Sequence, residues 1–354
     1  MKIGQSRFRT SVGAAVAAAA LVVGLAACSS DDATGSGNGS ATTTSDAAAE
    51  STVSYPLTVS GKFGESTIEA QPQRALPLSP QDADILLSLG ITPIAMPTDA
   101  QNQAATGGTG IFPWEADALG DETPEQLVME QGGSPVEQIA ALEPDVIVST
   151  GFWGLDQATF DQLNAQVPVV HFDTQANGEP WENSTRKVAE VMGVPEKAEE
   201  VIAAAHDKLE QAKADNPQVE GKTYNAIIGD MGGGQMAVLA SDERGIGQFI
   251  SSLGMELAPY ATTLPVDQDG RGLVSYENLG DLDADVVFVV TRTDDMGDYT
   301  KFEGWNTIPA VERGAVVQLA RTSGLPNAVG FPSAISLEWA TDQVMPKVTE
   351  ALEK

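Results

Sequence analysis

Short apolar runs alternate along the chain with stretches in which apolar residues recur at helical spacing. Strands are predicted at Ala75–Leu78, Pro93–Met96, Val146–Ser149, Val167–Phe172, Asn225–Met231, Met236–Ala240, Val286–Val290 and Val316–Leu319. Helical patterns between them include Gln81–Leu89, Pro135–Leu142 and Gly247–Leu253. A strand followed by a helix, repeated, predicts an α/β protein with mostly parallel sheets. Before this alternation begins, Tyr55–Ile68 has glycines at its middle and predicts an opening β-hairpin.

One helical pattern in the middle of the chain is longer than the others. It starts at Pro195, a residue suited to the first turn of a helix, and continues to about Ala214. Twenty residues at about 1.5 Å each extend roughly 30 Å, which is close to the diameter of a small domain. We interpret this helix as a rigid connection between two lobes. A surface helix within one domain is the alternative.

A repeated segment supports two lobes. Glu137–Val148 precedes the long helix and Glu277–Phe288 follows it. Each copy has a glutamate, an apolar residue two positions later, a leucine at five and an aspartate at eight, and then a buried-type strand. We expect one such unit in each half.

The first residues have the features of an export signal. Lys2, Arg7 and Arg9 precede the apolar stretch Val12–Ala27, which is followed by Cys28. The Leu-Ala-Ala-Cys sequence resembles a bacterial lipobox, which implies lipidation of Cys28, and this is the chain's only cysteine. The alternatives are an ordinary cleaved signal and a short membrane anchor. Residues 1–27 are thus expected to be the signal and residues 28–54 the lipidated cysteine with a flexible tether rich in Ser, Thr and Ala.

The charge of the chain excludes some partners. The formal net charge is −31, and removing three cations with the signal gives −31 − 3 = −34. Nucleic acid binding needs clustered Lys and Arg, so it is not expected. Electrostatic docking on anionic lipid is disfavoured for the same reason.

Seven segments in order resemble the iron-siderophore group of periplasmic-binding-protein-like substrate-binding proteins. They are Phe63–Ile68, Pro72–Arg74, Ser79–Gly90, Ile139–Asp145, Asp242–Gly254, Ser275–Leu279 and Trp305–Ala310. The resemblance implies an α/β fold of two lobes with central, mostly parallel sheets joined by a single long α-helix. The implied boundaries are an N-terminal lobe at 55–181, a helical segment at 182–215 and a C-terminal lobe at 216–354.

The resemblance also implies a function. A monomeric lipoprotein, anchored on the outer face of the cytoplasmic membrane, would capture a ferric siderophore and deliver it to the permease of an ABC importer. In the family, one surface glutamate on each lobe docks onto the permease. Glu137 and Glu277 hold equivalent places in the repeat and are the expected docking pair. Helix N-terminal charge stabilisation is the alternative role for both.

A ligand cleft is expected between the lobes, lined by loops at strand ends. Aromatic faces suit a flat chelator, and arginine forks onto anionic oxygens. The candidate ligand-binding residues are Ser79, Gln81, Trp114, Trp153, Arg244, Arg292, Arg321 and Phe331. Core packing for the aromatics and structural ion pairs for the arginines are the alternative roles.

The chain is poor in residues that bind metal directly. It has only two histidines, and His171 is interpreted as hydrogen-bonded structure rather than as a ligand. We therefore expect no resident cofactor or metal site, and iron that arrives already wrapped in a chelator. Haem or cobalamin binding remains an alternative, as does an exported hydrolase, although no Gly-x-Ser-x-Gly, His-Glu-x-x-His or P-loop motif is present.

Overall fold

The computed structural model describes residues 53–98, 100, 102–129, 136–267 and 269–354. The expected signal peptide, Cys28 and nearly all of the expected tether lie outside the described residues. Within the described part, the alternation of strands and helices gives an α/β structure with two lobes. None of the helices in this part combines the length and the apolar content that crossing a bilayer requires.

The N-terminal lobe is built on short parallel strands. Strands β3 (Ala75–Pro77), β6 (Val146–Ser149) and β7 (Val169–His171) form one parallel sheet, in the order β3-β6-β7. Strands β4 (Ala95–Thr98) and β5 (Glu125–Val128) form a parallel pair, and β1 (Leu57–Gly61) with β2 (Gly64–Ile68) forms the opening antiparallel hairpin. The helices of this lobe are α1 (Pro80–Ser88), α2 (Pro113–Leu119), α3 (Val136–Ala141), α4 (Gln157–Asn164) and α5 (Trp181–Val191).

The C-terminal lobe has one larger mixed sheet in the order β11-β9-β8-β12-β13, with β10 paired to β8. Its strands are β8 (Thr223–Gly232), β9 (Gln235–Leu239), β10 (Glu256–Leu257), β11 (Arg271–Ser275), β12 (Val286–Thr291) and β13 (Val316–Ala320). Its helices include α7 (Gly245–Ser252), α8 (Gly297–Thr300), α9 (Pro309–Arg313) and α10 (Leu325–Gly330), with short 3-10 turns between them such as η3 (Tyr276–Asp281). The strand β12 is buried along its whole length, as expected of a central parallel strand covered on both faces.

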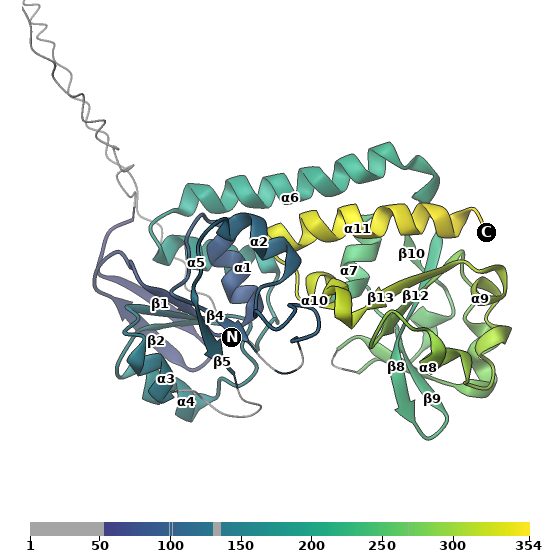
Figure 1. Ribbon diagram of the computed structural model, residues 1–354, viewed down its shortest axis with the longest axis horizontal. Helices are drawn as coiled ribbons and strands as arrows, with labels where there is room; N and C mark the ends of the chain where they lie inside the picture. Colours follow the sequence, from purple (N-terminus) through teal and green to yellow (C-terminus); the bar gives the residue numbers. More distant parts are fainter. Residues whose placement is uncertain (1–52, 99, 101, 130–135, 268) are drawn as a thin grey trace, which may run out of the picture. The chain divides into compact units, whose positions relative to one another are not determined.

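Two helices extend along both lobes. The helix α6 (Pro195–Asp215) starts with Pro195, and its 21 residues extend about 32 Å. The helix α11 (Ala334–Leu352) lies beside it (Figure 1). An ion pair between Lys208 of α6 and Asp342 of α11 joins the two helices at 2.6 Å. The single long helix α6 thus joins the lobes, as expected from the sequence, and α11 packs against it and contacts elements of both lobes.

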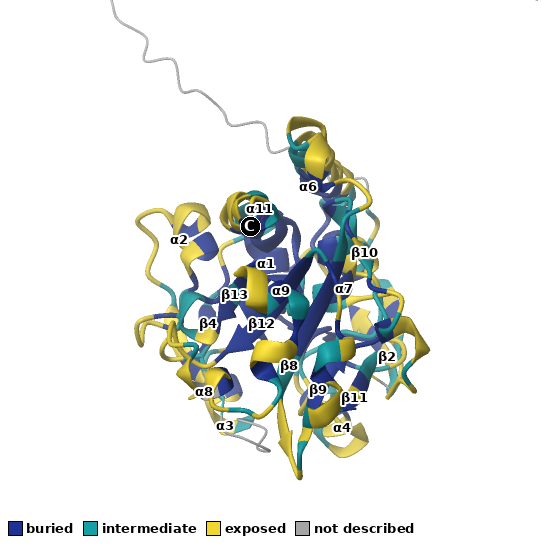
Figure 2. Cartoon of the chain, turned by 90° about the vertical axis from the view of Figure 1, so that its right-hand side faces the viewer, coloured by how far each residue is buried: buried dark blue, intermediate teal, exposed yellow. Residues whose placement is uncertain are grey.

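The core is continuous between the lobes. The largest buried apolar cluster contains Ile85 and Val146 from the N-terminal lobe and Phe288 from the C-terminal lobe, together with Ile202 of α6 and Val344 of α11. Figure 2 shows β12 as buried inside the molecule and α6 with an exposed outer face. Because apolar burial stabilises by about 25 cal/mol per Å², this shared cluster opposes separation of the lobes.

The repeated segment occupies equivalent places in the two lobes. In the first copy, Asp145 accepts backbone N–H bonds from Gln73 and Arg74, next to the start of β3. In the second copy, Asp285 accepts the backbone N–H and the hydroxyl of Thr223, the first residue of β8. Each aspartate therefore ties the start of a neighbouring parallel strand, β3 or β8, to the strand that the repeat itself provides.

His171 ends β7 and holds the opening hairpin. Its Nε2 accepts the backbone N–H of Phe63 at 3.0 Å, and its Nδ1 lies 3.3 Å from the carbonyl oxygen of Val169. The ring stacks on Phe63 with an interplanar angle of 8°. These bonds require a neutral imidazole protonated on Nδ1, and burial lowers the pKa of His171 below its ordinary value. His171 is thus part of the packing of the N-terminal lobe.

This role predicts an acid-sensitive stability. A histidine whose pKa is lowered in the folded state contributes stability that is present above its unfolded value of about 6.5 and is lost as the pH falls through that value. We expect the free energy of unfolding to fall below pH about 6.5 by up to about 1.4 kcal/mol per pH unit. His171→Gln, which can accept and donate but does not titrate there, should reduce this slope. Urea unfolding across a pH series measures it, and His206→Gln on the exposed face of α6 is the matched control.

Candidate ligand-binding cleft

A cavity of about 770 Å³ lies where the two lobes meet. Its lining comes largely from residues at or just after the carboxyl ends of parallel strands. Ser79 follows β3, Gly151 follows β6, Val290 lies at the end of β12, and Arg321 follows β13. The carboxyl edge of a parallel sheet is where ligands of α/β proteins usually bind. Both lobes contribute to one site.

The N-terminal wall of the cavity combines aromatic and amide side chains. Trp153 leaves 60% of its surface exposed, in the glycine-flanked loop after β6, and Phe152, Trp114 and Trp181 lie with it along this wall. The amides that line the same wall are Gln81, Asn102, Gln175 and Asn177. Such a surface offers flat contact area and neutral hydrogen bonds to a ligand.

A buried aspartate organises the start of this wall. Asp82 accepts the backbone N–H groups of Thr150 and Gly151 and the hydroxyls of Ser79 and Thr150. Burial raises the pKa of Asp82, although these bonds oppose the shift. A Cβ on Gly151 would stand 2.5 Å from the Ser79 oxygen, so the turn after β6 requires a glycine. Ser79 and Gln81 are thereby placed at the cavity.

The C-terminal wall carries the cations. Arg244, Arg271 and Arg321 line it, together with Glu243 and Asp269. Arg271 is ion-paired with both Asp267 and Asp269. Arg321 is exposed and has no ion-pair partner among the described residues. The exposed aromatic side chain of Phe331 completes this wall. The two walls thus differ in chemistry, because the described lining of the N-terminal wall includes Glu179 and Asp84 but no cation.

The sequence-based candidates fall into two groups. Those that line the cavity are Ser79, Gln81, Trp114, Trp153, Arg244, Arg321 and Phe331. Arg292 does not line it. The turn after β12 is held by Thr291, whose hydroxyl donates to the carbonyl of Thr293, and by Gln318, which donates to both residues. This turn leaves Arg292 exposed outside the cavity, so following a strand was not sufficient to place it there.

Some lining residues were not predicted. Arg271 is the first residue of the strand β11, and the residues just before it, Asp267–Gly270, have the composition of an acidic turn. The loop that contains Gln175 and Asn177 follows β7, and Asn177 has a left-handed backbone with φ 54°. An asparagine after a buried strand in a Gly-containing loop is a signal for such a turn, and it could have indicated this part of the wall.

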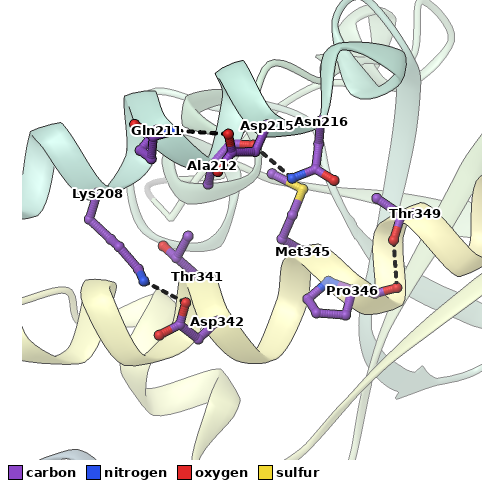
Figure 3. Close-up of a pocket in the computed structure, with 10 residues that line it drawn as sticks. All are labelled: Lys208, Gln211, Ala212, Asp215, Asn216, Thr341, Asp342, Met345, Pro346 and Thr349. Atoms are coloured by element: carbon purple, nitrogen blue, oxygen red, sulfur yellow. Dashed lines mark hydrogen bonds and ion pairs between the residues drawn. The ribbon is translucent and has the colours of Figure 1, made fainter.

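A second, smaller cavity lies between α6 and α11 (Figure 3). Its volume is about 350 Å³, and its polar lining is largely bonded internally. Lys208 binds Asp342, Gln211 donates to Asp215, and Thr349 donates to the carbonyl of Pro346. This cavity belongs to the junction of the two helices.

No group of three or more His, Cys, Asp or Glu in the described part of the chain is arranged to hold a metal ion.

The two candidate docking residues are both exposed. Glu137 lies in the first turn of α3, and Glu277 lies in the first turn of η3. They stand at equivalent positions of the repeated segment, one in each lobe.

Comparison with known proteins identifies the family. Residues 78–322 match the model of the periplasmic binding protein family. A protein of Bacillus subtilis named as the probable siderophore-binding lipoprotein YfiY is 25% identical over 283 residues, which cover 75% of this chain and 81% of that protein.

Solved structures have the same fold. A periplasmic solute binding protein from Mycobacterium smegmatis has a TM-score of 0.69 and 27% identity, with 83% of this chain and 98% of that chain covered. PiaA of Streptococcus pneumoniae, in complex with ferrichrome, has a TM-score of 0.70 at 17% identity, with 84% and 98% covered. The chain therefore belongs to the periplasmic binding protein family, as a distant relative of proteins named as siderophore-binding lipoproteins, and it is a substrate-binding protein rather than an enzyme.

Proposed function

We propose that this protein captures a ferric siderophore outside the cytoplasmic membrane and delivers it to the permease of an ABC importer. The single observation that carries the proposal is the cavity between the lobes, with arginines on one wall and aromatic side chains on the other. Its volume of about 770 Å³ lies within the range usual for small organic ligands. The iron would arrive as part of the ligand, with its donor atoms supplied by the chelator.

The chemistry of the walls suits such a complex. The guanidinium groups of Arg244 and Arg321 can donate paired hydrogen bonds to the anionic oxygens that surround a chelated iron. Trp153 and Phe331 can cover the organic part of the ligand from opposite lobes. The name of the Bacillus subtilis relative and the ferrichrome in the Streptococcus pneumoniae structure support the same ligand class.

Haem is the alternative that the lining disfavours. Haem iron commonly takes an axial histidine, tyrosine or cysteine, or a methionine in cytochromes. The described lining residues include no histidine, tyrosine or cysteine, and Met129 supplies one thioether. His171 is already bonded to Phe63 and Val169 within the N-terminal lobe. Cobalamin stays an outcome of the binding experiment below.

The N-terminal segment would keep the protein near its importer. We propose that Cys28 is lipidated after cleavage of residues 1–27, and that residues 28–54 tether the lobes to the outer face of the membrane. The name of the Bacillus subtilis relative includes the word lipoprotein, which supports this placement. Two acyl chains would give stable anchoring, since each buried methylene contributes about 0.8 kcal/mol.

Binding of the ligand can be tested directly. Protein lacking residues 1–27 and carrying Cys28→Ser is mixed with ferric hydroxamate siderophores, ferric catecholate siderophores, haem and cobalamin, and examined by native mass spectrometry and by quenching of tryptophan fluorescence. We expect at least one ferric siderophore to bind and to quench, because Trp114, Trp153 and Trp181 line the cavity. Binding of haem or cobalamin alone would refute the proposal.

The two arginines that follow the neighbouring strands β12 and β13 give a matched pair of variants. Arg321→Ala should weaken ferric siderophore binding by about tenfold or more, because a hydrogen bond to a charged group contributes roughly 1.5–3 kcal/mol. Arg292→Ala removes the same charge outside the cavity and should leave the affinity unchanged within about twofold. Fluorescence titration measures both. Equal losses in the two variants would mean that only the overall charge matters.

The docking role of Glu137 and Glu277 predicts a separation of binding from transport. Reversing both charges to lysine should leave the affinity for the ligand intact, since neither residue lines the cavity, and should abolish uptake of radioactive iron by cells. Asp207→Lys with Glu190→Lys, which reverses two exposed carboxylates on α6 and α5, is the control and should support normal uptake. Loss of ligand binding in the Glu137 and Glu277 variant contradicts the assignment.

A further inference from the structure

A buried hydrogen-bonded cluster beside the cavity joins the lobes. Asp84 of α1 is 2% exposed, and its Oδ2 accepts the hydroxyl of Ser333 at 2.9 Å. Ser333 is the N-cap of α11, and its oxygen also accepts the backbone N–H of Ser336 at 3.1 Å. Trp114 Nε1 donates to both oxygens of Asp84 at 2.9 Å, and the Trp114 ring packs against Trp339 of α11. A single carboxylate of the N-terminal lobe thus holds the first turn of α11.

Glu115 of α2 is the second acid of this cluster. It is fully buried, and its Oε2 accepts the backbone N–H of Phe112 at 2.5 Å. Its Oε1 is buried and has no hydrogen-bond partner in the described part of the chain, and its carboxyl neighbours that of Asp84. A carboxylate oxygen can only accept hydrogen bonds, so the unpartnered Oε1 can pair with the neighbouring carboxyl group only if one of the two carries a proton. Because Asp84 already accepts hydrogen bonds from Trp114 and Ser333, that proton belongs on Glu115 Oε1.

Among the described residues, no cation acts on Asp84 or Glu115 to offset two negative charges. Asp82, also on α1, adds repulsion at Asp84. On α11, Glu338 and Asp342 interact with each other and with Lys208 of α6. Two buried adjacent carboxyls without a counter-charge do not both ionise at neutral pH. Burial raises the pKa of Asp84 to about 7 and that of Glu115 well above its ordinary range, and repulsion between them adds to the rise at Glu115.

The cluster lies where it can control the cleft. Asp84 and Trp114 line the cavity, and so does Pro332, whose carbonyl accepts the side-chain amide of Gln81 at 2.9 Å. We propose that Glu115 is a protonated positioning residue, which fastens the first turn of α11 to the N-terminal lobe through Asp84 and Ser333 and so holds the cleft in its ligand-binding geometry. The effect on ligand binding rests on the function proposed above, whereas the fastening of α11 does not.

The sign of the pH dependence follows from the raised pKa values. An acid whose folded pKa is raised contributes stability that is fully present below its unfolded value of about 4 and is lost as the pH rises through the folded value. The pair titrates as a unit, so the loss begins before pH about 7 and continues in alkaline solution as Glu115 gives up its proton. The junction at α11 should therefore loosen as the pH rises.

Hydrogen exchange of the ligand-free chain tests the fastening without any ligand. Between pH about 6 and pH about 9, and after correction for intrinsic rates, we expect protection of the amides of Ser336 and Leu337 to fall about tenfold or more. Glu115→Gln keeps a donor toward Asp84 and an acceptor for Phe112 but cannot lose a proton in this range. It should keep the protection at both pH values, whereas Glu115→Ala should lose it at both.

Two further variants separate this mechanism from a merely structural role. Glu338→Gln changes an acid outside the cluster, on α11, whose pKa is also raised by burial, and it should leave the alkaline fall in protection in place. Ser333→Ala removes the bond to Asp84 and should give low protection that no longer responds to pH. An alkaline fall that persists in Glu115→Gln, or that disappears in Glu338→Gln, overturns the proposal.

Ligand binding is then measured with any ferric siderophore that the unmodified chain binds, at the same two pH values. At each pH we take the ratio of the affinity of Glu115→Gln to that of the unmodified chain. Any effect of pH on the chelate itself is the same for both proteins, so it does not change this ratio. We expect this ratio to rise about tenfold from pH 6 to pH 9. A constant ratio with the exchange result intact would overturn the link to the cleft, and failure of every siderophore to bind would refute only the proposed function.

Discussion

The cleft depends on the apolar contact that α6 and α11 share with both lobes. Residues from both sheets and from both helices form one buried cluster, so the lobes cannot separate without exposing apolar surface to water. A fold with a single connecting helix could rotate about that helix. A second helix beside it, joined through Lys208 and Asp342 and capped by Ser333 against Asp84, restricts that rotation. Domain motion should therefore be a small adjustment of packed elements.

Much of this architecture could be predicted from the sequence because strong local patterns carry it. The apolar runs that became β6 and β12 are buried along their whole length, and the helical spacing after Pro195 predicted α6. The helix α11 was not predicted, although it is almost as long. Pro346 stands inside it and lacks the N–H that a helix interior uses, so the local pattern argues against a continuous helix. Tertiary packing on α6 and on the sheet outweighs that local cost.

The candidate site was predictable only in part, for a geometric reason. Ser79, Trp153 and Arg321 follow strands whose carboxyl ends meet at one edge, so the pattern places them near each other. Arg292 also follows a strand, but the hydrogen bonds of Thr291 and Gln318 turn the chain away from the cavity. Arg271 reaches the cavity from an edge strand far from any obvious motif. The pairing of Asp84 with Glu115 joins residues 31 positions apart, and no local spacing indicates it.

The difference between the two walls has a consequence for the orientation of the cargo. A ligand with an anionic face and an apolar face gains its full set of contacts only when the anionic face meets Arg244 and Arg321 and the apolar face meets Trp153. The reverse orientation would place the anionic face of the ligand against indole rings, where burying a charge without a partner costs a few kcal/mol or more. The cleft should therefore favour one orientation of such a ligand over the reverse.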